Sequence, residues 1–103
     1  MKKVQLVYQH GYKKHYYAYP KIYNFFVKDE LADKLTFKEN GLLITTAPTA
    51  DAKKQRVVAY LVSNPVPANE DDEYKVLGKD TEIIKLTNNQ KKNLDEYLKE
   101  NQL

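Results

Sequence analysis

Two histidines in a short, tyrosine-dense stretch are the side chains in this chain best suited to chemistry. His10 and His15 lie five positions apart within residues 8–28, which hold six of the nine tyrosines and no acidic residue. One imidazole as general base and one as general acid could cleave RNA through its 2′-hydroxyl, with Lys13 or Lys14 holding the phosphate. The pair could also ligate a metal, but the stretch has no carboxylate to orient either ring. Two surface histidines beside a turn are therefore the preferred interpretation.

Other catalytic equipment is nearly absent from the sequence. The chain has no cysteine, which excludes thiol nucleophiles, thiolate zinc sites and disulfides. Its one serine, Ser63, has no Gly-x-Ser-x-Gly surroundings, and three glycines form no phosphate-binding loop. No stretch carries a family signature. We therefore expect a non-enzymatic protein with no cofactor and no metal.

Binding is the better use of the same stretch. Single-stranded nucleic acid is held by cations along its backbone and by aromatic rings that stack on its bases. One β-ribbon would supply both through Tyr12, Lys13, Lys14, His15, Tyr16, Tyr17 and Lys21. We therefore expect a nucleic-acid partner, either RNA or single-stranded DNA. Core packing is the competing explanation for any single tyrosine, because a chain without Trp needs other rings to fill its interior.

An acidic protein surface is the alternative partner. Tyrosine is frequent at interface hot spots because it combines a large, rather rigid contact area with one polar tip. The chain would then be an inhibitor or adaptor, such as a compact protein of a phage or plasmid. Four consecutive acids, residues 70–73, could engage a second, basic site, although a solvated loop is the preferred interpretation of this run. The oligomeric state stays open.

The distribution of charge favours an anionic or acidic partner more than the total does. Residues 1–28 contain six lysines and no acid, whereas the remaining 75 residues contain 11 basic and 14 acidic groups. Like charges gather where something compensates them. Biased nucleotide composition would explain an excess of 16 Lys over one Arg, but it explains the clustering less well.

Length and hydropathy indicate one domain covering residues 1–103. A chain of this size can bury a core without a metal or a disulfide. Its apolar runs are only a few residues long, so we expect no membrane span and no signal peptide. A cytoplasmic protein is the resulting expectation.

Short strands are expected to position the binding residues. The pattern predicts a first strand over 4–8, a turn over 9–11 and a return strand over 12–19. Gly11 is the natural residue for a positive φ in that turn. Residues 22–27 form either a third strand or a buried connector.

Later signals predict two more hairpins and a central strand. Asn40 and Gly41, between two β-prone runs, are typical of a tight turn. Residues 56–63 form the most hydrophobic strand, which should lie near the centre of the sheet. Residues 74–86 resemble a further hairpin that turns at 78–80.

Helices are expected at two places, over 29–35 and over 87–102. In the second, Thr87 can cap the first turn and Gln90 can return the hydrogen bond. Its apolar stripe consists of Leu94, Tyr97 and Leu98. The fold class is therefore α+β, a mostly antiparallel curved sheet or small open barrel of about five to seven short strands with one C-terminal helix packed on it.

Overall fold

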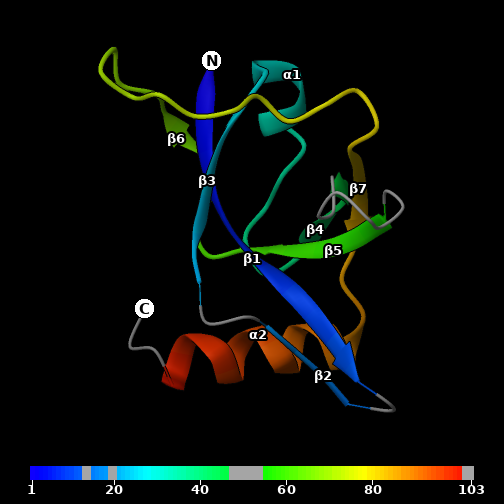
Figure 1. Cartoon of the computed structure of the whole chain (residues 1–103). Helices are drawn as coiled ribbons and strands as arrows, with labels where there is room; N and C mark the ends of the chain where they lie inside the picture. Colours follow the sequence, from blue (N-terminus) through cyan, green and yellow to red (C-terminus); the bar gives the residue numbers. More distant parts are fainter. Residues whose placement is uncertain (13–14, 19–20, 47–54, 101–103) are drawn as a thin grey trace.

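One long strand, β1, organises the sheet. The computed structural model describes residues 1–12, 15–18, 21–46 and 55–100. In chain order, the elements of these residues are β1 (Lys2–Tyr12), β2 (His15–Ala18), β3 (Tyr23–Val27), α1 (Asp29–Ala32), β4 (Asn40–Thr46), β5 (Gln55–Leu61), β6 (Val66–Pro67), β7 (Glu82–Lys85) and α2 (Asn88–Glu100). The predicted α+β class is confirmed: the strands form a curved, open sheet whose named strands all pair antiparallel, and α2 packs on it (Figure 1).

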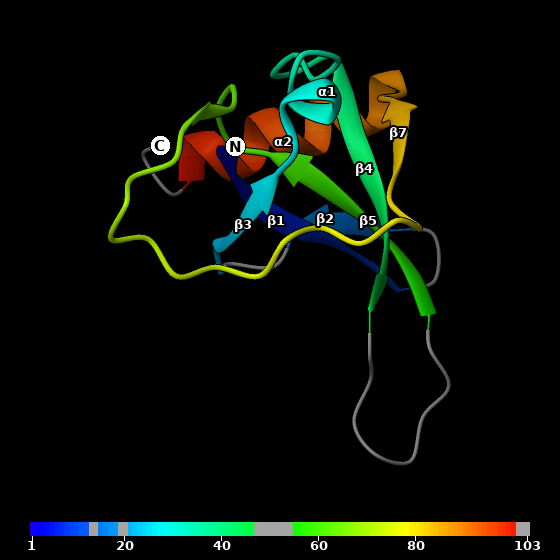
Figure 2. The ribbon, with the colours of Figure 1, turned by 90° about the horizontal axis from the view of Figure 1, so that it is seen from above.

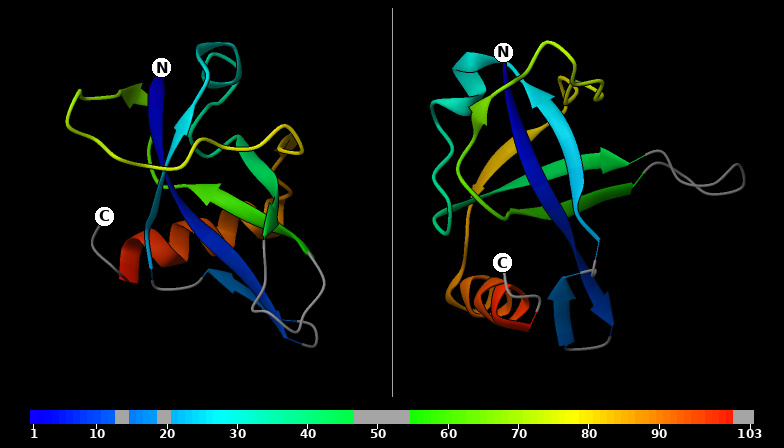
Figure 3. Two further views of the ribbon diagram at one scale, coloured as in Figure 1. Left: turned by 45° about the horizontal axis from the view of Figure 1, so that its top comes forward. Right: turned by 90° about the vertical axis from the view of Figure 1, so that its left-hand side faces the viewer.

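The two halves of β1 have different neighbours. The strand order is β2-β1-β5-β4-β7, with β3 and β6 also paired to β1. The first half of β1 pairs with β3, where Leu6 lies opposite Tyr23, and the second half pairs with β2, where Gln9 lies opposite Ala18. Figure 3 shows β1 crossing the molecule with β3 beside its first half and β2 beside its end. β5, the most hydrophobic strand, lies centrally between β1 and β4, as predicted.

Alternation along β1 divides the core between the two faces of the sheet. Val4 and Leu6 belong to the cluster inside the curve, which also holds Ala32 and Leu35 from α1 and the turn after it. Val7 belongs to the outer cluster, together with Tyr60, Leu86, Leu94, Tyr97 and Leu98. Because side chains of a strand alternate between faces, one strand serves both clusters. The three-residue apolar stripe predicted for α2 is buried in the outer cluster, and this part of the prediction is confirmed.

The predicted start of α2 is also confirmed. The backbone N–H of Gln90 donates to the Thr87 hydroxyl at 3.2 Å, and the backbone N–H of Thr87 donates to the Gln90 side chain at 2.9 Å. This reciprocal pair satisfies donors that the first helical turn leaves free. The shorter helix, α1, covers only the first part of the predicted range 29–35 and has Lys28 at its N-cap.

The predicted turn at Asn40 and Gly41 is wrong. Both residues lie in β4, and Gly41 pairs with Tyr60 on one side and with Ile84 on the other. A Cβ at Gly41 would lie 2.8 Å from Leu86 Cδ2 and 2.9 Å from the Ala59 carbonyl oxygen. The glycine is required by close packing of the central strand and not by a positive φ, which no described glycine has.

The chain instead turns just before β4. Backbone N–H groups of Glu39 and Asn40 donate to the Thr36 carbonyl, and the Asn40 side chain accepts from the Thr36 N–H at 3.1 Å. Lys38 has a left-handed backbone, with φ of 71°. A side-chain cap by Asn40 therefore replaces the expected Asn-Gly turn.

The hairpin predicted over residues 74–86 is also wrong. Val76 forms a parallel bridge with Phe26 of β3, whereas β7 pairs with β4. The segment thus runs from the outer edge of β3 to the far side of the sheet and extends the curve between them (Figure 2). The local pattern predicted that residues 74–77 and 81–86 pair with each other, but the first segment pairs with β3 and the second with β4.

No helix within the four described ranges is long and apolar enough to span a bilayer.

Candidate functional site

The ribbon, defined here as the paired parts of β1 and β2, carries most of the predicted binding residues. His10 lies opposite Tyr17, and Tyr12 lies opposite His15. The predicted turn over 9–11 is therefore wrong, because β1 continues through Gly11 to Tyr12. The local sequence predicted a turn at Gly11, but Gly11 pairs with Tyr16 of β2 within the antiparallel ladder.

Only some of the seven predicted binding residues are described, and only one of them, Lys21, with its side chain. Lys13 and Lys14 lie outside the described residues. For Tyr12, His15, Tyr16 and Tyr17 the backbone is described and the side chains are not. Lys21 is described in full and is exposed. The proposed binding roles of Tyr12, Lys13, Lys14, His15, Tyr16 and Tyr17 therefore stay predictions. The side-chain contacts of Lys21 are described.

The register assigns ribbon positions to two faces. Opposite residues of an antiparallel ladder belong to one face, and neighbours along a strand alternate. Positions 10, 12, 15 and 17 therefore share the face of Tyr8, while 11, 16 and 18 share the face of Gln9. The Gln9 side chain accepts hydrogen bonds from the Tyr60 hydroxyl and from the Gln90 amide, the latter at 3.3 Å. Because Gln90 belongs to α2, the Gln9 face is the one toward the helix.

Tyr8, Tyr23 and Lys21 form a cluster where β1 passes from β3 to β2. The two rings lie 4.8 Å apart between centroids at 49°. Lys21 Nζ lies 4.8 Å from the centroid of Tyr23, a cation–π contact. Burial raises the pKa of the Tyr8 hydroxyl, and the neighbouring Tyr23 raises it further, so the phenol stays neutral at physiological pH. The cluster combines ring faces with a positive charge.

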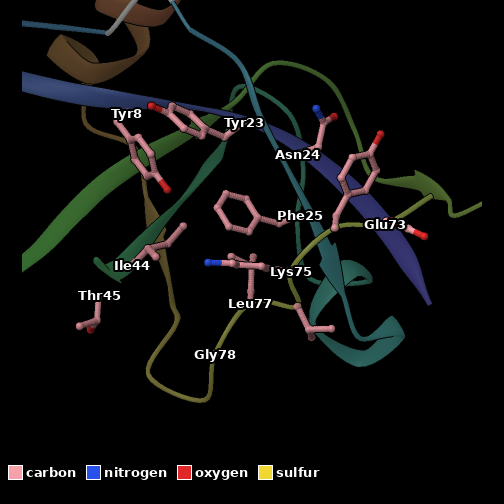
Figure 4. Close-up of a pocket in the computed structure, with 12 residues that line it drawn as sticks. Tyr8, Tyr23, Asn24, Phe25, Ile44, Thr45, Glu73, Lys75, Leu77 and Gly78 are labelled. Atoms are coloured by element: carbon pink, nitrogen blue, oxygen red, sulfur yellow. The ribbon is translucent and has the colours of Figure 1, made fainter. Parts of the chain in front are cut away.

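A groove of about 680 Å³ opens beside this cluster. Its apolar lining comes from Tyr8, Tyr23, Phe25, Ile44 and Leu77, and further lining comes from Asn24, Thr45, Glu73, Tyr74, Lys75, Val76 and Gly78. Figure 4 shows Tyr8 from β1, Phe25 from β3, Ile44 from β4 and Lys75 from the segment before β7 around the groove. The groove lies over the same interior cluster that α1 contacts through Ala32. The helix covers one part of this cluster, and the groove leaves another part open. We call this site the groove.

Sequence reasoning did not find the groove. Phe25 and residues 73–78 are distant in sequence and line one groove because residues 75 and 77 hydrogen-bond to Phe26 of β3. Aromatic content drew attention to the amino-terminal stretch, but no local signal links that stretch to residues 73–78.

Part of the amino-terminal positive charge is neutralised by acids from later segments. Lys3 Nζ lies 3.1 Å from Asp72, Lys2 Nζ lies 3.8 Å from Asp33, and the terminal amine lies 3.3 Å from Asp29. In the described ranges, no acidic side chain forms an ion pair with Lys21. Among the described lysines of this stretch, Lys2 and Lys3 at the start of β1 are therefore compensated, whereas Lys21 lies over the Tyr23 ring.

One residue of the acidic run 70–73, Asp72, is held by hydrogen bonds. Asp72 accepts from the backbone N–H of Asn69 at 2.9 Å and from Lys3 at 3.1 Å. These two donors hold the pKa of its carboxyl below the ordinary value. The other three acids of the run are exposed. Asp72 thus anchors the loop to β1.

The two histidines occupy diagonal positions on one face of the ribbon. His10 lies opposite Tyr17, two residues from His15 along β2. Diagonal neighbours in such a ladder are about 7–8 Å apart between Cα atoms. As for metals, no three His, Cys, Asp or Glu side chains gather within the described ranges.

A comparison of this chain with protein-family models, with curated proteins and with solved structures found no match.

Proposed function

We propose that this protein is a small, non-enzymatic, cytoplasmic protein that binds single-stranded nucleic acid along the ribbon and the adjoining cluster. The observation that supports it most is the contact of Lys21 with the Tyr23 ring, beside Tyr8. A cation and aromatic faces at one exposed place are what a strand of nucleotides needs, because its phosphates are anionic and its bases stack. Positions 12, 15 and 17, on the same face of the ladder as Tyr8, extend this surface along β1 and β2.

A single strand fits the composition better than a duplex. Sequence readout in the major groove relies chiefly on bidentate arginine contacts to guanine. The chain has one arginine, and Arg56 Nη2 is already paired with Glu82 at 3.0 Å. Lysines bind phosphate as point charges, and tyrosines stack on any base. Binding should therefore discriminate strongly between single and double strands and weakly between sequences.

Fluorescence anisotropy with labelled oligonucleotides tests the proposal. The variant that carries Lys13→Gln, Lys14→Gln and Lys21→Gln should bind a single-stranded probe at least tenfold more weakly than the natural chain, because phosphate contacts supply most nonspecific affinity. A matched variant carries Lys85→Gln, Lys92→Gln and Lys99→Gln on β7 and α2, where all three lysines are exposed. It changes net charge equally and should bind nearly normally. Equal losses in both variants would reject the ribbon as the binding surface.

An acidic protein partner is the other outcome of the same experiment. It predicts no affinity for oligonucleotides in the natural chain, together with loss of a co-purifying protein in the ribbon variant only. That result would replace nucleic acid with protein as the ligand of the ribbon.

Ribonuclease activity is the enzymatic alternative, and the diagonal register of His10 and His15 favours it. Two histidine positions on one face of the ladder would allow one residue to act as base and the other as acid on one phosphodiester. His10→Ala and His15→Ala should then each abolish cleavage of an RNA probe while leaving its binding intact. Equal cleavage by both variants and the natural chain would exclude these roles.

A further inference from the structure

The groove lies on the same face of β1 as three of the predicted binding positions, 12, 15 and 17, whereas position 16 is on the opposite face. Tyr8 lines the groove, and by register positions 10, 12, 15 and 17 continue its face of the ladder. Lys21 contacts Tyr23, a second residue of the groove lining. A strand bound along the ribbon would therefore reach the groove at Tyr8. The volume of about 680 Å³ falls within the range of small-ligand sites, roughly 300–1,000 Å³.

The lining of the groove suits a flat aromatic ligand. Phe25 and Tyr8 are partly exposed rings that pack on the interior cluster from its open end. The hydroxyls of Tyr8 and Tyr23, which also line the site, can donate or accept hydrogen bonds, whereas the Asn24 side chain points away from Phe25 (Figure 4). A nucleobase has flat faces that stack on aromatic rings and polar edges that form hydrogen bonds. Aromatic rings and a few polar groups therefore suit it.

Charge decides between a nucleotide and a cationic ligand. A site for a quaternary ammonium group needs free ring faces without competing cations. Here Lys21 already contacts the Tyr23 ring, and Lys75 lines the groove. In Figure 4 the Lys75 amine points toward the Ile44 side of the groove, whereas the Glu73 carboxylate points away from Phe25. The electrostatics therefore favour an anionic ligand.

We infer that the groove is a base-binding subsite that takes one unstacked nucleobase of the bound strand, with Lys75 near its phosphate. This inference rests on the proposed function, because the strand reaches the groove from the ribbon. The ring of Phe25 provides a stacking surface, and the segment 75–77, bonded to β3 beside it, contributes Lys75 and Leu77 to the lining. Occupation of the groove adds one stacked base to the contacts of the ribbon.

Matched substitutions of two phenylalanines test the subsite. Phe25→Leu removes the ring but keeps a smaller apolar side chain against the interior cluster. Phe37→Leu is the control, since Phe37 is also partly exposed and packs on the same cluster without lining the groove. For a single-stranded probe of about twelve nucleotides, Phe25→Leu should weaken binding about tenfold, and Phe37→Leu less than about twofold. Lys75→Glu should weaken it more than Lys79→Glu, an exposed lysine outside the groove.

A second readout uses the unmodified protein and does not depend on folding of a variant. The same single-stranded oligonucleotide, titrated into ¹⁵N-labelled protein, should shift the backbone amides of residues 23–25 and 74–78. Shifts from an oligonucleotide at these amides, combined with the Phe25→Leu loss, support the subsite. Oligonucleotide binding that leaves these amides and both leucine variants unchanged would overturn the subsite and leave the ribbon proposal standing. Absence of oligonucleotide binding by the natural protein would overturn both.

Discussion

At position 41 the backbone of β4 lies too close to its neighbours for any side chain. The nearest atoms come from Leu86, after β7, and from the carbonyl of Ala59 in β5. The backbone carbonyl cannot withdraw as a flexible side chain could, so a methyl group there must displace a central strand. Glycine at this site therefore permits three strands to pack closely.

Gly41→Ala should lower the free energy of unfolding by about 1–3 kcal/mol, the usual cost of overpacking a core. Gly78→Ala is the matched control, because a Cβ there meets nothing within 4 Å. That variant should be neutral or slightly more stable, since it restricts the unfolded chain. Urea denaturation measures both. Equal stability of the two variants would contradict the packing account of Gly41.

Tyr60 links stability to alkaline pH. It is fully buried, and burial raises its pKa from 10.0 to about 12. Between these values the unfolded chain loses the phenolic proton while the folded chain keeps it. The contribution of Tyr60 is therefore complete below pH 10 and is lost as the pH rises toward 12.

Tyr60→Phe should accordingly flatten the fall of unfolding free energy between about pH 10 and 12. At neutral pH the variant should lose roughly 1 kcal/mol, because Gln9 then lacks the hydroxyl donor. Denaturant melts at several pH values compare the two slopes. Parallel curves for variant and natural chain would mean that this phenol does not titrate as described.

Among the elements, those with a strong local pattern were predicted and those defined by distant pairing were not. α2 has its cap at Thr87 and its stripe within one segment, and β5 is a continuous apolar run. The predictions of turns at Gly11 and Gly41 were wrong because both glycines lie in strands whose pairing depends on the whole sheet. The hairpin predicted for residues 74–86 was wrong for the same reason, since Val76 pairs with Phe26 of β3, about fifty positions earlier in the chain.

Asp72 ties the acidic loop 70–73 to β1, and this tie should depend on pH. Its carboxyl has a pKa below the ordinary 3.8 because Asn69 and Lys3 donate to it. The stabilisation is therefore present above that value and is lost as the pH falls through it toward the lower folded value.

Asp72→Asn should lower stability at neutral pH, and its difference from the natural chain should shrink below about pH 4. Asp71→Asn, at an exposed position of the same loop, serves as control and should have little effect. Thermal melts at neutral and acidic pH measure both variants. A constant difference across this range would show that the charge of Asp72 is not what anchors the loop.

For the whole molecule, the structure adds to the sequence a division of charge and a groove lined by aromatic side chains. Lys2 and Lys3 pair with acids of later segments, whereas Lys21 remains beside the rings of the cluster. Composition predicted a basic, tyrosine-rich surface, but four separate segments build the groove next to it. Such a site arises from strand order, which composition does not determine.

The salt dependence of single-strand binding tests the central claim most directly. For each phosphate that a lysine neutralises, log affinity should fall by about 0.7 per log unit of salt. The natural chain should therefore show a steep negative slope, and Lys13→Gln, Lys14→Gln and Lys21→Gln together should reduce its magnitude by about two. A slope near zero in the natural chain, or the same slope in both proteins, would contradict binding of nucleic acid by the ribbon.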